Sequence, residues 1–365
     1  MKKFIPQISR KQILWACGGI FCLILIGAIS LMEGLFRAGL YDQQMAKRWS
    51  SKKNVAQISC FFADEEVSDK GYFTTIGHTV DKALMEANIV PENENSRLWI
   101  DAISRSGKVT LSNGSKSVEL EAVGVQGEFF QFHPLRLLEG AFFGPDSMMQ
   151  DGVVIDEDAA WQLFGSNDVA GMQVMIGQVP HYITGVVQRE TGRLAEAAGL
   201  DKSLCYLNLE NLELYGKVTG GYCYEMVLPN PVEGFALSTL SKAVGTEGRE
   251  LEILENTGRY ELLPLIKVIG LFGVRSMSKK SFAYPYWENV ARGYEDIFAL
   301  TLLLKAMLSI LPCVLAVVTI IRLWKRKTWT LKQGYHKLAD RLYDYRVKRH
   351  TKKKSAAHAA EWRKK

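Results

Sequence analysis

The sequence predicts an α+β domain held between two transmembrane helices. Two long apolar runs, at 13–32 and 297–321, are each long enough to cross a bilayer. Between them, short strand-like stretches alternate with a few amphipathic helical patterns, an order typical of α+β domains. Charge is segregated in the same way, because both ends of the chain are basic whereas 13–321 holds 25 basic and 36 acidic residues.

The first apolar run, ILWACGGIFCLILIGAISLM, contains twenty residues and no charge. At about 1.5 Å per residue, a helix of this length crosses a hydrocarbon core of about 30 Å. A cleaved signal peptide is the alternative, with Ala28 and Ser30 as a weak cleavage pattern. The apolar stretch of such a peptide usually has about 7–15 residues, so the length of this run favours a membrane anchor.

Basic segments flank the two runs. Residues 1–12 hold four Lys or Arg and no acid, and residues 322–365 hold sixteen Lys or Arg and three acids. Basic flanks stay in the cytoplasm. We therefore expect a two-pass protein of the cell membrane, with both termini cytoplasmic and with residues 33–296 extracytoplasmic.

The segment between the runs is expected to begin with a helical stalk at 33–53. An amphipathic helix follows at 69–88, where Phe73, Ile76 and Val80 share one face. A second helix is expected at 233–244. Strands are expected at 54–62, 97–104, 107–112, 115–125, 152–156, 173–177, 181–188, 203–209, 222–228 and 249–257, with Asn113-Gly114 as a hairpin turn and a helix-free loop between 209 and 222.

A short helix is expected between Asp156 and Gly165. Asp156 is a good N-cap, acidic residues follow it in the first turn, and Gly165 suits the C-terminal position. Within this helix, Trp161 and Phe164 are expected to pack against the sheet.

The order of elements predicts two lobes. One is split between 54–121 and 200–261, and the other is a β-rich insert at about 122–191. Residues 262–274 are too few to span a membrane and are expected to form a core or membrane-surface helix. The full organisation is a cytoplasmic N-terminus at 1–12, transmembrane helices at 13–32 and 297–321, a stalk at 33–53, an extracytoplasmic domain at 54–261, connecting helices at 262–296 and a basic cytoplasmic tail at 322–365.

Three stretches of the insert carry a family resemblance. They are GVQGEFFQFHPLRLLEGAFF (124–143), VVIDEDAAWQLFG (153–165) and VAGMQVMIGQVPHYITGVV (169–187). In this order they resemble the extracytoplasmic (periplasmic) core domain of the MacB-type ABC transporter permease family. The resemblance implies one lobe similar to the porter domain of efflux pumps and one inserted sheet-rich lobe. Gly140 suits a turn with positive φ, and Gly185 suits a bulge or a close backbone approach.

The resemblance also implies a function. It indicates a permease-like membrane subunit of an ABC-type export or mechanotransmission complex, with an ATP-binding cassette ATPase and/or other permease subunits as partners. The ATPase is expected on a separate chain, because this sequence holds no G-x-x-x-x-G-K-[ST] phosphate loop. Members of the family usually have four spans, so two spans predict a short variant. The alternative is a non-transporting, membrane-anchored extracytoplasmic scaffold or binding protein.

No pattern in the sequence indicates an enzyme. His78, His133 and His181 lack metal-ligand spacing to another His or Cys, so surface or hydrogen-bonded histidines are expected. A Cys205–Cys223 disulfide is one alternative, and unpaired core cysteines are the other, favoured because the outer cysteines are odd in number. We expect no catalytic residue, no metal site and no cofactor.

Lys305 is the candidate for a functional contact inside the membrane. It lies eight residues into the second run, about 12 Å along a helix. A charge at this depth is expensive in lipid and usually faces protein, which predicts contact with a partner helix. The alternative is that the span begins near Ala306 and that Lys305 reaches outward to the membrane surface.

The basic tail carries an amphipathic pattern. Apolar and aromatic residues recur in it at 4-3-4-3 spacing among Lys and Arg, at Leu331, Tyr335, Leu338, Leu342 and Tyr345. Such a helix would lie on anionic membrane lipids, pair with a second copy or dock a cytoplasmic partner. We expect no nucleic-acid partner, because the tail is tethered to a membrane.

Overall fold

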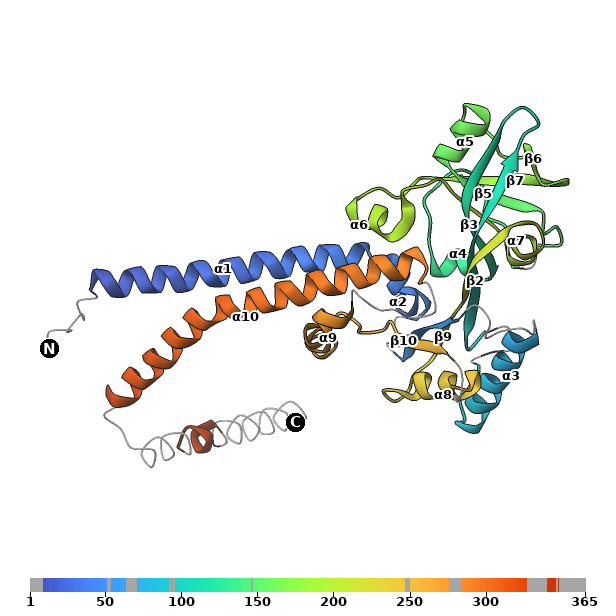
Figure 1. Ribbon diagram of the computed structural model, residues 1–365. Helices are drawn as coiled ribbons and strands as arrows, with labels where there is room; N and C mark the ends of the chain where they lie inside the picture. The colour runs from blue at the N-terminus through green and yellow to red at the C-terminus, as the bar shows by residue number, and fades with distance from the viewer. Residues whose placement is uncertain are drawn as a thin grey trace, which may run out of the picture. The chain divides into compact units, whose positions relative to one another are not determined.

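The structure is a computed structural model that describes residues 9–50, 54–63, 71–91, 93, 96–145, 147–246, 250–275, 284–326, 340–345 and 347. The chain divides into two compact units (Figure 1). One unit is residues 30–304, which contain the α+β domain. The other joins residues 1–29 with residues 305–365. Most of the amphipathic pattern predicted for the tail lies outside the described residues.

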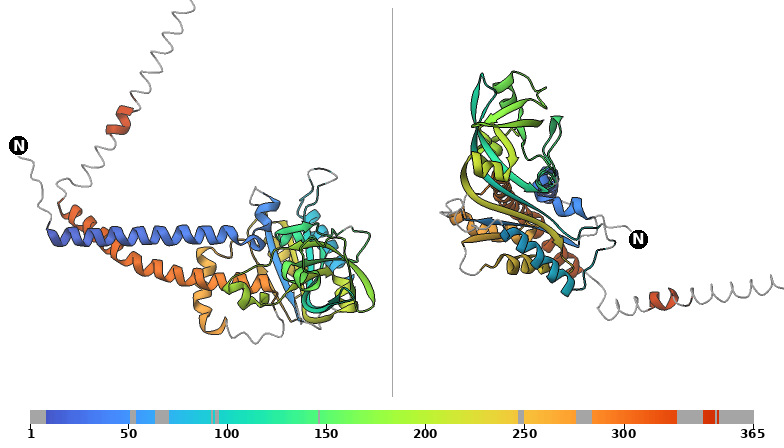
Figure 2. Two further views of the ribbon diagram at one scale, coloured as in Figure 1. Left: turned by 90° about the horizontal axis from the view of Figure 1, so that it is seen from above. Right: turned by 90° about the vertical axis from the view of Figure 1, so that its right-hand side faces the viewer.

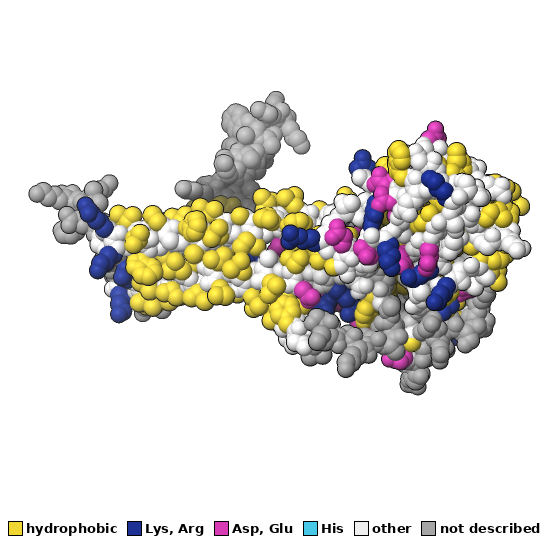
Figure 3. Space-filling view, turned by 45° about the horizontal axis from the view of Figure 1, so that its top comes forward, with side chains coloured by type: hydrophobic (Ala, Val, Ile, Leu, Met, Phe, Trp, Pro, Cys, Tyr) yellow, Lys and Arg dark blue, Asp and Glu magenta, His cyan; other side chains and the backbone are white. Residues whose placement is uncertain are grey.

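Two helices account for the apolar runs. They are α1 (Arg10–Gly39) and α10 (Tyr286–Arg326), and both are long and apolar enough to cross a membrane. Hydrophobic side chains cover the long helices in the space-filling view (Figure 3). Within the unit formed by 1–29 and 305–365, a Cβ at Gly19 of α1 would lie only 2.8 Å from the side chain of Leu315 in α10. Glycine at this position therefore lets the two helices pack closely.

The predicted α+β class is confirmed, because ten described strands form one sheet. Its order is β10-β1-β9-β2-β3-β8-β5-β7-β4, and β6 pairs with β2 and β7. The strands are β1 (Val55–Phe62), β2 (Ile100–Ser112), β3 (Ser117–Gly127), β4 (Leu137–Gly140), β5 (Gly152–Asp156), β6 (Gln173–Ile176), β7 (Val179–Val187), β8 (Leu204–Asn208), β9 (Lys217–Pro229) and β10 (Leu251–Glu255). Most neighbours are antiparallel, and the parallel pairs are β3 with β8 and β5 with β7.

Helices cover the two ends of this sheet. At one end, α3 (Gly71–Glu86) and α8 (Phe235–Val244) pack side by side over β1 and β9 (Figure 2). At the other end, α5 (Glu157–Phe164) and α7 (Leu209–Tyr215) close a second core over β5, β7 and β8. The remaining helical segments are η1 (Tyr41–Gln43), α2 (Met45–Trp49), α4 (Phe129–Phe132), α6 (Arg193–Ala195), η2 (Glu196–Leu200) and α9 (Leu262–Arg275).

Several local predictions are confirmed. The Asp156 carboxylate accepts a hydrogen bond from the Ala159 amide at 2.7 Å, and Gly165 ends α5 with φ at 74°. Gly140 has φ at 75°. Gly185 lies at a register shift between β5 and β7, and a Cβ there would meet the Ala141 carbonyl oxygen at 2.9 Å, so it marks both a bulge and a close approach.

Four other predictions were wrong. Trp161 is largely exposed and does not pack against the sheet, although Phe164 does. The segment between 209 and 222 is not helix-free, because the Asn208 side chain caps α7 and Leu212 anchors it in the core. The strands expected at 97–104 and 107–112 are one strand, β2, which continues through Gly107 with a bulge rather than ending there. The stalk helix ends at Gly39, before η1 and α2.

Candidate functional site

The outer ends of α1 and α10 pack against each other inside the unit 30–304. The rings of Phe36 and Tyr294 lie 6.1 Å apart, and the Arg37 guanidinium lies 5.1 Å from the centre of the Phe298 ring. Thr301 donates a hydrogen bond to Glu33, which is buried. The last turns of α1 therefore pack against α10 around the start of its apolar run.

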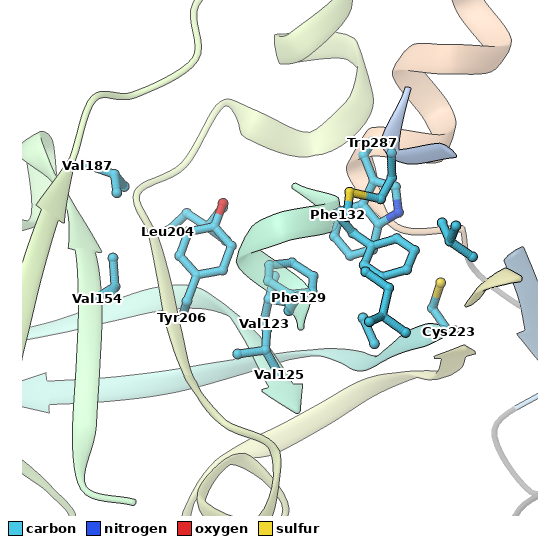
Figure 4. Close-up of a cluster of buried hydrophobic side chains, with 14 of the residues drawn as sticks. Val123, Val125, Phe129, Phe132, Val154, Val187, Leu204, Tyr206, Cys223 and Trp287 are labelled. Atoms are coloured by element: carbon cyan, nitrogen blue, oxygen red, sulfur yellow. The ribbon is translucent and has the colours of Figure 1, made fainter. Parts of the chain in front are cut away.

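The beginning of α10 is also anchored in the core of the sheet. Trp287 is buried, and its ring centre lies 4.3 Å from that of His133 and 5.5 Å from that of Phe129. Figure 4 shows Trp287 among Phe129, Phe132 and the side chains of the strands. This apolar cluster surrounds a set of buried polar groups.

These buried polar groups form one connected set, which we call the junction network. Its members come from η1, β1, the end of α4, β9, the turn after β10, and α10, and they are joined by hydrogen bonds or ion pairs. They are Asp42, Gln43, Ser59, His133, Glu225, Asn256, Arg259, Glu288, Arg292 and Glu295.

His133 is at the centre of the first half of the network. Its Nδ1 lies 2.9 Å from a carboxylate oxygen of Asp42, and its Nε2 lies 2.5 Å from one of Glu225. The other Glu225 oxygen accepts a hydrogen bond from the Ser59 hydroxyl at 2.8 Å. Ser59 in turn accepts one from the Asn256 amide at 2.7 Å. The residues after α1 are thereby connected to β1 and β9.

The protonation state of His133 follows from these neighbours. Burial works against the charged imidazolium, but the carboxylates of Glu225 and Asp42 outweigh it and raise the pKa of His133 to about 9. At neutral pH the ring is therefore an imidazolium that donates from both nitrogens. A buried carboxylate, Glu225, would be costly in this place without such a partner.

Arg259 is at the centre of the second half. Its guanidinium donates to both carboxylate oxygens of Glu288, at 2.8 and 2.9 Å, and to Glu295 at 2.6 Å. It also donates to the side-chain oxygens of Gln43 at 3.1 Å and Asn256 at 3.0 Å. One side chain thus contacts the segment after α1, the turn after β10, and two positions on α10 that are about two helical turns apart.

In this half of the network, ion pairs offset the cost of burying charged groups. Burial works against a charged guanidinium, but Glu288 outweighs it and raises the pKa of Arg259. Arg292 adds a second cation, 2.8 Å from Glu288, and reaches Glu252 of β10 at 3.0 Å. The guanidinium fork fits carboxylates in a fixed geometry, so it orients α10 against the turn as well as holding it there.

The network holds together segments that are far apart in the chain. Its histidine is enclosed by its carboxylates and by Trp287, and its serine hydroxyl, Ser59, is buried and donates to Glu225 rather than to the histidine. Among the described residues, no three His, Cys, Asp or Glu side chains are placed to hold a metal ion. What the arrangement can do is link displacement of either membrane helix to the central strands.

The residues singled out by sequence have different positions. Lys305 lies half-buried in α10, and its role stays a prediction. His78 is exposed and His181 is buried with a hydrogen bond to the Val179 carbonyl, as expected. Cys205 and Cys223 are buried and unpaired, so the disulfide alternative is wrong.

Comparison with known proteins identifies the class of this domain. The MacB-like periplasmic core domain family matches residues 19–221, which is more than half of the chain. The chain belongs to this family, and with its two apolar helices it is a membrane protein with an extracytoplasmic segment.

Two relatives show how far the similarity extends. The macrolide export ATP-binding/permease protein MacB 1 of Aeromonas hydrophila subsp. hydrophila is 37% identical over 89 residues, which cover 24% of this chain and 14% of that protein. The protein MacB of Pasteurella multocida is 37% identical over 76 residues, covering 20% and 12%. The match therefore spans only a small part of the length of these relatives.

Solved structures give weaker similarities. The periplasmic region of MacB from Actinobacillus actinomycetemcomitans aligns with a TM-score of 0.40 and 16% identity, over 60% of this chain and 93% of that one. The extracellular domain of the noncanonic ABC-type transporter YknZ from Gram-positive bacteria aligns with a TM-score of 0.34 and 13% identity, over 54% and 99%.

Proposed function

We propose that this chain is a permease-like membrane subunit of an ABC-type export or mechanotransmission complex, with the ATPase on a separate chain. Family membership supports the class of complex. The observation that carries the proposal is the junction network, in which Arg259 joins the segment after α1, the turn after β10, and α10. Movement of either membrane helix would then pull on β1, β9 and β10.

The topology proposed with this function has both termini in the cytoplasm and residues 33–296 outside. The distribution of Lys and Arg supports it, because 1–12 and 322–365 are the basic flanks. We propose that the core domain comprises residues 54–261, with an inserted lobe at about 122–191. Lys305 is proposed to contact a partner subunit inside the membrane, and the basic tail to contact lipid.

The test is a crosslinked pull-down from native membranes with the full chain as bait. An ATP-binding cassette ATPase, with or without a further permease subunit, should be recovered, and the purified chain alone should neither bind nor hydrolyse ATP. Recovery of extracytoplasmic proteins only, without any ATPase, would support the scaffold alternative. ATP turnover by the chain alone would show that the proposal is wrong in kind.

The alternative of a binding protein without transport has one observation in its favour. A cleft of about 710 Å³ lies at the end of α3, lined by residues that include Met85, Ile89 and Trp99. Trp99 donates a hydrogen bond to Asp81 at 2.6 Å, which fixes one wall of this cleft. The same pull-down decides between the two functions.

A further inference from the structure

Helix α9 is apolar on its inner face and on most of its outer face. Its inner face, with Leu265 and Val268, is buried against Phe298 and Ala299 of α10. Its outer face is formed by apolar side chains that are 50–71% exposed, at Leu262, Leu263, Ile266 and Leu271. A helix that is apolar on both faces is stable inside protein or in a membrane, and in water it would be unfavourable. The outer face is therefore expected to contact protein or lipid rather than water.

The position of α9 indicates which molecule contacts its outer face. In Figure 1, α9 is seen end-on while the nearby part of α10 lies across the view, and Figure 2 shows α9 running across α10. Its contacts with α10 fall at Phe298 and Ala299, the first residues of the apolar run. Arg275, at the end of α9, pairs with Glu295 and Asp296, the last acids before that run. The helix thus crosses α10 at the border between charged and apolar side chains.

We infer that α9 is an interfacial helix that lies in the outer leaflet of the membrane. The neighbouring part of α10 also exposes apolar side chains, among them Ile297 and Leu300. The one charge between 262 and 273 is Lys267, which is exposed and suits the lipid phosphates at headgroup level. The occupant of the outer face is therefore lipid rather than a partner protein.

This placement has a consequence for the domain above the membrane. Helix α9 begins three residues after Arg259, and the Leu265 amide hydrogen-bonds to the Glu261 carbonyl at 3.1 Å, so the turn and the helix are continuous. A helix held in the headgroup layer fixes the height of this turn over the bilayer. The junction network would then move relative to a fixed reference, the membrane surface.

The inference is tested by quenching of a fluorophore on α9. Ile266→Cys is made in a chain whose Cys17, Cys22 and Cys313 are serine, labelled with an environment-sensitive dye and reconstituted in phosphatidylcholine–phosphatidylglycerol vesicles. Matched variants are Leu214→Cys on α7, which is similarly exposed, and a label within the predicted span at Leu300. Lipids with a nitroxide near the headgroup end of the acyl chain serve as quenchers.

We expect the label at 266 to lose most of its emission to the shallow nitroxide, whereas the label at 214 is unchanged. A label at 266 that responds only to a water-soluble quencher would overturn the inference. So would protection from both quenchers, because a protein would then cover the face; a second copy would be recognised by crosslinking between labelled chains. Near-UV circular dichroism identical to that of the parent chain shows that each variant is folded.

Discussion

Replacing Arg259 by methionine should destabilise the unit 30–304 more than the loss of an exposed ion pair would. The change removes the donors to Gln43, Asn256, Glu288 and Glu295 but keeps most of the side-chain volume. Glu288 is 1% exposed and would keep its ion pair with Arg292, and Glu295 is 7% exposed and would keep its ion pair with Arg275. Removing one partner of a buried ion pair costs up to about 3–5 kcal/mol, because the remaining charges are left buried with less compensation.

The matched control is Arg97→Met. Arg97 is 60% exposed and pairs with Glu128 at 3.0 Å, an interaction worth about 0–1 kcal/mol. Thermal unfolding of the full chain in detergent, followed by near-UV circular dichroism at pH 7, compares the two variants. At about 2–4 °C per kcal/mol, Arg259→Met should lower Tm by up to roughly 6–20 °C. The Tm of Arg259→Lys should lie between those of wild type and Arg259→Met, because a lysine ammonium cannot form the bidentate hydrogen bonds of the guanidinium. Equal Tm values for Arg259→Met and Arg97→Met would refute this account of the junction network.

Three other outcomes are expected. Folding raises the pKa of His133 from about 6.5 to about 9, so the charged ring contributes on the order of 3 kcal/mol to stability. This contribution is fully present below about pH 6.5 and is lost as pH rises through 9, so the Tm difference between wild type and His133→Gln should shrink over that range. A constant Tm difference would argue against a charged ring. In intact cells, an impermeant thiol reagent should label Ser115→Cys but no cysteine placed in 322–365; a labelled tail would reverse the proposed topology. Lys305→Leu should lower co-purification of a partner permease or ATPase subunit at matched expression, whereas Ser309→Leu should not; equal recovery would leave Lys305 as a marker of the membrane boundary.

Local features of the fold could be predicted because their causes are local. The run NVAQISCFF predicted β1, the face of α3 followed from its helical period, and the caps of α5 followed from Asp156 and Gly165. The wrong predictions have tertiary causes. Gly107 suggested a break, yet a Cβ there would meet the Lys217 carbonyl at 2.8 Å, so glycine serves close packing inside a continuous strand.

The junction network could not be predicted from spacing, because its partners are far apart in the chain. His133 and Glu225 are 92 residues apart, and Ser59 and Glu225 are 166 apart. One signal was present: Glu225 interrupts the apolar strand YCYEMVL. An acid in the middle of a buried strand needs a partner, and only the folded chain shows that His133 supplies it.

The polar character of this junction is itself informative about its use. Well-packed apolar side chains would stabilise such a contact as well as a buried ion pair does, so stability alone does not explain Arg259, Glu288 and His133. An apolar contact also lets helices slide with little penalty, whereas a guanidinium fork holds one register. We interpret the junction network as the device that fixes the register of α10 against the turn after β10. On this interpretation, displacement of the membrane helix would carry the sheet along or break several buried hydrogen bonds at once.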